Sequence, residues 1–251
     1  MGFRIRERAC MAVFVSRGAG MARTDDHTLE GIRLLADLPP EVRRQLEKLC
    51  TWRRFARGDE IIGHQTDTQD VFLITRGRVR VHISTGGGRE ITFDDLDEGM
   101  HFGEVAAIDG KSRSASVVAI EPTTLACLSG KLFVELCHQH PAFAISVMRN
   151  MAEIMRRFID RVVTLSTLGA HNRVHAELLR LARTHQGASG ALMIRPIPRH
   201  GEIAARVSTT RETVARVLAD LAHENIVARE SDALVIRDPR RLSVLVEKAH
   251  K

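Results

Sequence analysis

The sequence predicts an α+β protein with an N-terminal β-roll or barrel, a long helix and a C-terminal winged helix-turn-helix. Three observations support this prediction. Short β-type runs broken by turn residues fill 53–129, a heptad-spaced apolar pattern follows over 141–168, and two short helices with a hairpin complete the chain. The 251 residues are 44% apolar, which is enough for a core in each of two domains.

Residues 1–27 are expected to be a disordered or mis-assigned tail, and Met21 is a candidate start. The apolar stretch 9–15 is at the short limit for a signal-peptide core, and Arg6 stands where a myristoylation motif needs Ser or Thr. No apolar run approaches the roughly 18 residues of a membrane helix. No membrane partner is therefore expected.

Residues 28–140 are expected to form the β domain. Its strand-like runs are EIIGHQ, VFLITRGRVRVHI, REITFDDL, SASVVAI and TTLACLS. The glycines of STGGGRE (84–90) are interpreted as a hairpin tip rather than a phosphate loop, because no helix follows them. The four cysteines, Cys10, Cys50, Cys127 and Cys137, have no C-x-x-C spacing, so a reducing cytoplasm is favoured and no metal site is expected.

Residues 141–169 are expected to form a long helix and a hinge. A heptad seam is formed by Met148, Met151, Met155, Phe158, Val162 and Leu165. A second apolar edge, with Val147, Ile154 and Ile159, is expected to pack on the β domain. The pattern favours a homodimer through 141–168, and the alternative is a lone amphipathic helix docked on its own domain. Gly169 interrupts the pattern and is the expected hinge.

Residues 170–251 are expected to form the winged domain. The pattern predicts a helix over 172–185, a loop over 186–198, helices over 199–207 and 211–226 around the turn STT, and a hairpin over 227–238. The buried stripe of the second short helix is expected to be Val214, Val217, Leu218 and Leu221. The segment 171–251 holds 14 Lys and Arg residues against 9 Asp and Glu residues, which favours an anionic partner.

The exposed face of the second short helix carries groups that can read a DNA major groove. Arg211 and Arg216 can donate to guanine, and Glu212 can accept from the cytosine amino group. The alternative is a solvated, salt-bridged face. Contacts to DNA phosphate are expected from Arg199, His200, Arg206 and Thr210.

The stretch FGEVAAIDGKSRSASVVA (102–119) places an acid and a base on a loop between strands. Arg113, followed by Ser114, can pair with a phosphate, and Glu104 can accept from a sugar hydroxyl. Gly103 permits a close backbone approach before a short helix whose N–H groups favour an anion. The alternative is an Arg113–Glu104 ion pair that closes the loop. No nucleophile and base have catalytic spacing, so an enzyme is not expected.

Two of these stretches resemble one known family. The stretch 102–119 resembles the phosphate-binding cassette of cyclic-nucleotide-binding domains, F-G-E, a few small apolar residues, then R-S/T/A-A. The stretch STTRETVARVLADLAHENIV (208–227) resembles the helix-turn-helix of the catabolite activator branch of the CRP/FNR transcription regulators. The resemblance covers about residues 28–240, with all parts in the family's order.

The resemblance implies a cytoplasmic, homodimeric regulator that binds double-stranded DNA and uses cAMP or cGMP as an allosteric ligand, with no other cofactor. The cyclic phosphate would be held by Arg113 and Ser114, with a backbone contact from Gly103, and the ribose 2′-hydroxyl by Glu104. Base readers would be Arg211, Glu212 and Arg216, acting on a TGTGA half-site and its inverted copy. RNA polymerase is a further partner that the resemblance implies.

The sequence departs from the catabolite activator on the long helix. Phe158 and Ile159 stand where the family member offers Thr-Ser hydroxyls to adenine, and Thr164 and Thr167 are the nearest hydroxyls downstream. Ile154 stands where that member has an arginine, a role that Arg156 or Arg157 could take. Two alternatives follow: a regulator of the same family whose β domain binds no nucleotide, and a nucleotide-binding partner of an enzyme that uses its winged domain for protein contacts.

Overall fold

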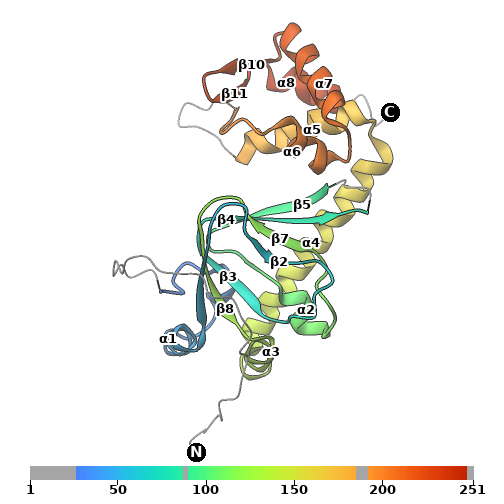
Figure 1. The fold of residues 1–251 in the computed structure, drawn as a ribbon. Helices are drawn as coiled ribbons and strands as arrows, with labels where there is room; N and C mark the ends of the chain where they lie inside the picture. The colour runs from blue at the N-terminus through green and yellow to red at the C-terminus, as the bar shows by residue number, and fades with distance from the viewer. Residues whose placement is uncertain (1–26, 87–89, 185–191, 248–251) are drawn as a thin grey trace, which may run out of the picture.

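A computed structural model describes residues 27–86, 90–184 and 192–247 and confirms the predicted fold class (Figure 1). An antiparallel β domain is followed by a long helix and a C-terminal helix-turn-helix domain. The expected tail up to residue 26 and residues 87–89 of the expected hairpin tip lie outside the described residues.

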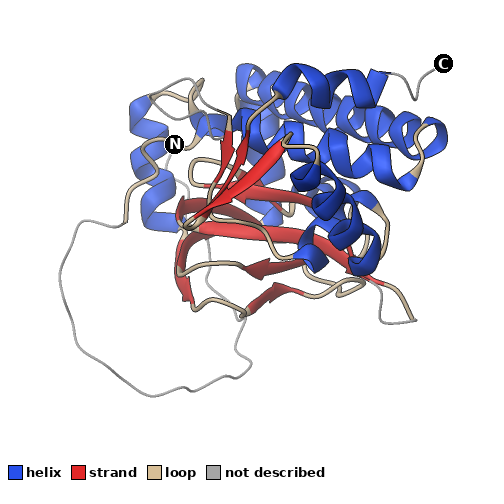
Figure 2. Ribbon diagram, turned by 90° about the horizontal axis from the view of Figure 1, so that it is seen from above, coloured by secondary structure: helices blue, strands red, loops and turns tan. Residues whose placement is uncertain are grey.

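The β domain consists of two four-stranded antiparallel sheets (Figure 2). One has the order β1-β8-β3-β6 and the other β2-β7-β4-β5. The strands are β1 Thr51–Phe55, β2 Glu60–Ile62, β3 Val71–Arg76, β4 Arg78–Ser84, β5 Glu90–Asp97, β6 His101–Phe102, β7 Ser116–Ala119 and β8 Thr123–Leu128. Their inward-facing apolar residues, among them Ile74, Val79 and Leu125, are fully buried and form one core. This core anchors the β4–β5 pair through Val79 and Leu96.

Four short helical segments complete the β domain, and only the one after Gly103, α2, was predicted from the sequence. They are η1 Arg33–Leu35, α1 Pro40–Leu49, α2 Glu104–Asp109 and α3 Gly130–Gln139. The Ser129 hydroxyl caps α3 by accepting from the amide of Leu132. Phe133 of α3 meets Phe143 of the next helix edge to face, with 5.6 Å between ring centroids. This contact joins the long helix to the core of the β domain.

The long helix α4, Pro141–Thr167, agrees with the predicted range and runs from the β domain to the winged domain (Figure 1). Val147 is buried, as the predicted second edge requires. Ile159 of the same edge is instead 55% exposed, because the C-terminal half of α4 extends beyond the core that Val147 contacts. The prediction that Ile159 packs on the β domain was therefore wrong.

The winged domain contains α5 Ala170–Thr184, β9 Met193–Ile194, α6 His200–Val207, α7 Arg211–His223, β10 Val227–Glu230, β11 Ala233–Ile236 and α8 Pro239–Glu247. Its three-stranded sheet has the order β10-β11-β9, so part of the expected loop 186–198 is the strand β9. The expected stripe of α7 is correct, with Val214, Val217 and Leu221 buried and Leu218 partly buried. Within the described ranges, no helix is long and apolar enough to cross a membrane.

Candidate functional site

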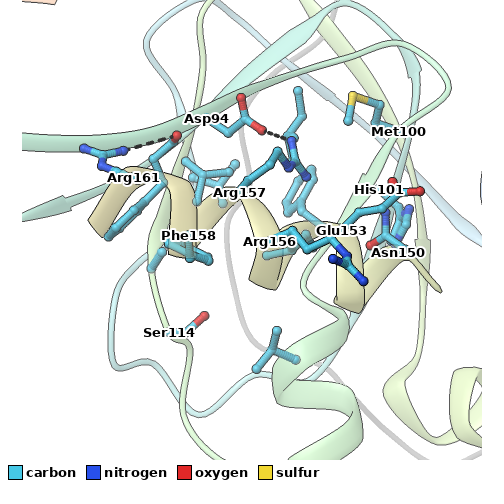
Figure 3. Close-up of a pocket in the computed structure, with 18 of the residues that line it drawn as sticks. Asp94, Met100, His101, Ser114, Asn150, Glu153, Arg156, Arg157, Phe158 and Arg161 are labelled. Carbon is cyan, nitrogen blue, oxygen red and sulfur yellow. Dashed lines mark hydrogen bonds and ion pairs between the residues drawn. The ribbon is translucent and has the colours of Figure 1, made fainter. Parts of the chain in front are cut away.

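A cavity of about 1320 Å³ lies between the β domain, α4 and the winged domain. Figure 3 shows the lining residues of the β domain and of α4. Its walls come from β5, β6 and α2, from one face of α4, and from α5 and α6. Small-molecule pockets usually measure about 300–1,000 Å³. The cavity is therefore large enough for a nucleotide, and it is bordered by both domains.

Arg113 is the most buried charged side chain of this cavity, with 3% of the residue exposed. Its Nε donates to the Thr68 hydroxyl at 2.9 Å, Nη1 to the Gly103 carbonyl at 2.9 Å, and Nη2 to the Asp70 carbonyl at 2.8 Å. Its guanidinium also lies over the Phe72 ring, 5.7 Å from the centroid. Neutral acceptors hold the guanidinium, rather than the Glu104 carboxylate of the ion-pair alternative.

Gly103 is required by this arrangement. Its φ of +91° lies in the left-handed region, and an added Cβ would come within 2.7 Å of the Asp70 carbonyl oxygen and 2.8 Å of Arg113 Nη1. Any other residue here would push on the groups that fix Arg113. The glycine thus lets the backbone and the guanidinium pack together.

Glu104 follows directly, and it is 5% exposed. Its Oε2 atom has no hydrogen-bond partner in the described part of the chain, and burial raises the pKa of its carboxyl. A buried acceptor without a partner is unfavourable, which makes it a place where a ligand hydroxyl can bind. Ser114 is exposed and lines the same cavity, so the predicted residues 103, 104, 113 and 114 are brought together there.

On the α4 side, the cavity is lined by Ile154, Arg156, Arg157, Phe158 and Thr164. Phe158 meets Phe93 of β5 edge to face, with 5.7 Å between centroids. The Arg157 guanidinium donates to Asp94 at 2.5 Å (Figure 3). Ile159 is not among the lining residues of its own chain. The Thr164 and Thr167 hydroxyls donate to the helix carbonyls of Asp160 and Val163, both at 2.8 Å.

Sequence reasoning missed Arg161, which joins the cavity to the winged domain. Its Nη1 donates to the Thr92 carbonyl at 2.7 Å, its guanidinium lies 5.6 Å from the Phe93 centroid, and its Nη2 donates to the Arg206 carbonyl at 3.0 Å. Burial lowers the pKa of Arg161. The sequence could have indicated this residue, because Arg161 follows Arg157 by four positions and therefore lies on the same face of α4.

The expected base readers lie together at the N-terminal end of α7. Arg211, Glu212 and Arg216 are all exposed, and the Thr210 hydroxyl caps the helix by accepting from the amide of Thr213 at 3.2 Å. The Glu212 backbone amide and the Thr210 hydroxyl lower the pKa of the Glu212 carboxyl, so it is an ionised acceptor. This face offers two donors and one acceptor to a groove.

Three of the expected phosphate contacts, Arg199, His200 and Thr210, are exposed around α6 and the turn that follows it. Arg206 is not: its side chain is 10% exposed and pairs with Asp95 of the β domain, with Glu177 nearby at 3.8 Å. In this arrangement carboxylates occupy the Arg206 guanidinium, so the predicted phosphate contact is not open to it.

Comparisons with known proteins match both domains. Residues 52–140 match the family model "Cyclic nucleotide-binding domain", and residues 172–245 match "Crp-like helix-turn-helix domain". The chain is 33% identical over 210 residues to the cyclic AMP receptor protein of Thermus thermophilus, across 84% of this chain and 94% of that protein. It is 27% identical to the CRP-like cAMP-activated global transcriptional regulator of Mycobacterium tuberculosis, across 87% and 98% of the two chains.

Solved structures of CRP/FNR regulators are also similar to this chain. A transcriptional regulator of the CRP family from Thermus thermophilus has 28% identity and a TM-score of 0.64, across 79% of this chain and 98% of that one. A CooA mutant from Carboxydothermus hydrogenoformans has a TM-score of 0.71 across 90% and 98%, and at 23% identity it supports the fold alone. The cassette, the helix-turn-helix and these likenesses agree, and the chain belongs to the CRP/FNR family of DNA-binding transcription regulators.

Proposed function

We propose that this regulator is a homodimer whose affinity for DNA is controlled by a cyclic nucleotide, cAMP or cGMP. The observation that carries the proposal is the buried Glu104 Oε2, which has no hydrogen-bond partner among the described residues, within the cassette that also holds Arg113. A ribose 2′-hydroxyl would supply the missing donor. The alternative of a β domain without a ligand leaves this buried carboxylate unexplained.

In the proposed complex, Arg113 and Ser114 hold the cyclic phosphate. The three described bonds of Arg113 use three of its five N–H groups, which leaves two for phosphate oxygens. The exposed Ser114 hydroxyl adds a neutral donor. Charge-assisted bonds from a guanidinium that is already fixed need little further ordering, which favours binding.

The base would lie toward α4. Phe158 supplies an aromatic surface in this cavity, and Ile159 follows it on α4. Neither side chain can form a hydrogen bond with the base and so distinguish adenine from guanine. Both cAMP and cGMP are therefore candidate ligands. The names of the Thermus and Mycobacterium relatives favour cAMP.

The dimer would form along α4. Large apolar side chains of this helix are exposed at Ile145, Met148, Met155, Phe158, Ile159, Val162, Val163 and Leu165, from 37% to 61% each. A stripe of this length in water is unfavourable unless a second helix covers it. Two paired α4 helices would also place two copies of α7 for a two-fold DNA site.

Each α7 would read one half-site of the TGTGA type, with the inverted copy one helical turn away. Arg211, Glu212 and Arg216 would contact base edges, and Arg199, His200 and Thr210 would contact phosphate. As a cytoplasmic regulator it would act on transcription through RNA polymerase, as the family resemblance implies.

Nucleotide titration calorimetry on the full chain tests the proposal. Arg113→Leu removes the phosphate contact and is expected to abolish binding of cAMP and cGMP while the protein remains folded. The matched control is Arg76→Leu, which removes an exposed arginine at the end of β3 and should bind like wild type. Unchanged affinity in Arg113→Leu, or no binding to the wild type, would contradict the nucleotide site.

A further inference from the structure

A cluster of largely buried charged side chains lies between the β domain and the winged domain, and its most exposed member, Glu202, is 34% exposed. We call it the interdomain charge cluster, and its members are Arg80, Asp95, Glu177, Glu202 and Arg206. Figure 1 shows the β4–β5 hairpin lying against α6, and the two elements are in contact. Charged groups are seldom buried unless they are paired, so this cluster favours one particular docking of the two domains.

Asp95 is the centre of the cluster. Its side chain is 18% exposed and accepts from Arg80 Nε at 2.8 Å and Nη2 at 3.0 Å, and also from Arg206 Nη2 of the winged domain. Although burial opposes ionisation of Asp95, the hydrogen bonds and charges of Arg80 and Arg206 lower its pKa overall. One ionised carboxylate therefore bridges arginines of two domains.

The other members hold α6 and α5 in place around this bridge. Arg80 Nη1 reaches Glu202 of α6 at 3.3 Å, and Glu177 of α5 accepts two bonds from Arg180, both at 2.7 Å. Arg206 and Glu177 are each 10% exposed at their side chains. The docking thus depends on contacts between residues more than 100 positions apart in the chain.

The position of Arg206 suggests what the docking does. The first helix of a helix-turn-helix crosses the DNA backbone, and α6 is that helix here. Arg206 is the last basic residue of α6, but its guanidinium donates to Oδ2 of Asp95. A carboxylate presents anionic oxygens to a guanidinium as a phosphate does. The same arginine cannot bind both at once.

The cluster also adjoins the cavity. Consecutive residues of β5 contribute to the cavity and to the cluster. Phe93 and Asp94 line the cavity, and the preceding Thr92 carbonyl accepts a hydrogen bond from Arg161. The next residue, Asp95, accepts from Arg206 in the cluster. Arg161 in addition donates to the Arg206 carbonyl. A displacement of β5 or α4 at the cavity would therefore strain the docking of α6.

We propose that Asp95 acts as a DNA-phosphate mimic, which docks α6 on the β domain and withdraws Arg206 from DNA until the cavity wall moves. Release of the docking by a nucleotide rests on the proposed function above. The docking itself, and the competition for Arg206, rest on the contacts of the cluster. The two parts can therefore be tested separately.

The first test is a titration of the full-length protein with one 30-base-pair duplex at fixed salt and without nucleotide. Asp95→Asn keeps the size of the side chain and removes its charge, so roughly tenfold tighter DNA binding is expected. The matched control is Asp97→Asn, which removes the same charge from the same strand but pairs with Arg78 at an exposed site. Its affinity should stay close to that of wild type. Equal affinities of the two variants would overturn the proposal.

The second test asks whether Arg206 is the group that is released. The gain from Asp95→Asn should disappear in the Arg206→Gln background, and the slope of log affinity against log salt should steepen by about 0.9 in the single variant. If Asp95→Asn still raised DNA affinity in the Arg206→Gln background, Asp95 and DNA phosphate would not be competing for Arg206. If Asp95→Asn does not fold, Glu202→Gln removes a more exposed partner of Arg80 and should give a smaller shift in the same direction.

Hydrogen exchange of the peptides that contain β5 and α6 measures the docking without DNA or nucleotide. Asp95→Asn should exchange faster than wild type in both peptides, and Asp97→Asn should not. Unchanged exchange would overturn the docking role of Asp95 even if a nucleotide binds. Faster exchange in a protein that binds no nucleotide would support the docking and refute only the nucleotide gating.

Discussion

At the residue scale, the candidate nucleotide site depends on two buried charged side chains in very different states. Arg113 is held by three oxygen acceptors, whereas Glu104 has a carboxylate oxygen without a partner among the described residues. The first is organised in advance for an anion. The Glu104 carboxylate destabilises the folded chain unless a ligand donates a hydrogen bond to it.

Glu104→Gln is expected to separate stability from binding. The amide removes a buried charge, so the free energy of unfolding should rise by about 1 kcal/mol, while nucleotide affinity should fall about tenfold or more because the charge-assisted bond is lost. Urea unfolding and calorimetry measure the two effects. Glu98→Gln, at an exposed position, is the control. A variant with lower stability and unchanged affinity would contradict the proposed role of Glu104.

A second prediction concerns pH. Burial lowers the pKa of His101, on the cavity wall, from 6.5 to about 4. The unfolded chain therefore binds this proton first, and His101 destabilises the fold progressively as pH falls from 6.5 toward 4, with no effect above 6.5. Between pH 7 and pH 4, wild type should lose about 2–3 kcal/mol more than His101→Gln. Urea unfolding measures this difference. If the free energy of unfolding fell equally with pH in wild type and in His101→Gln, the loss would not come from His101.

The cavity residues of the cassette could be predicted from sequence because they lie within one short stretch. Gly103 and Arg113 are only ten positions apart in that stretch, and they form a hydrogen bond. Asp95 and Arg206 are 111 positions apart, and no local pattern in FDDL or AARV indicates that they meet. Arg206 was therefore predicted to face DNA from its place on α6 alone.

At the scale of elements, periodicity predicted the long regular elements and missed several of the short ones. α4 and α7 carry apolar residues at spacings of three and four, and their predicted positions agree with the structure. β9 has only two residues and exists through its pairing with Leu234 and Val235 of β11. Such a strand is created by tertiary contacts rather than by its own pattern.

The arrangement of α7 leads to a prediction about DNA sequence. Glu212→Ala removes the one acceptor among the three base-reader candidates, so discrimination should fall by about 1–3 kcal/mol at a single base pair of the half-site. Arg229→Ala, an exposed position on β10, is the control. Competition binding against every single-base variant of the half-site measures the effect. An equal loss of affinity for all sequences would show that Glu212 does not read a base.

At the scale of the whole molecule, one cavity borders the β domain, α4 and the winged domain, and the buried interdomain charge cluster lies beside it. A ligand can shift the arrangement of two domains only if it binds one arrangement more tightly than the other. A cavity whose walls belong to both domains meets this condition, because a change in docking changes the cavity itself.

The central claim is that a cyclic nucleotide controls DNA binding. The most direct test is a gel-shift titration at fixed salt on a duplex with TGTGA and its inverted repeat, without ligand, with cAMP, and with cGMP. At least one of the two nucleotides should shift the binding curve by about tenfold or more. Equal binding under all three conditions would contradict it and would leave a DNA-binding regulator whose β domain takes no nucleotide.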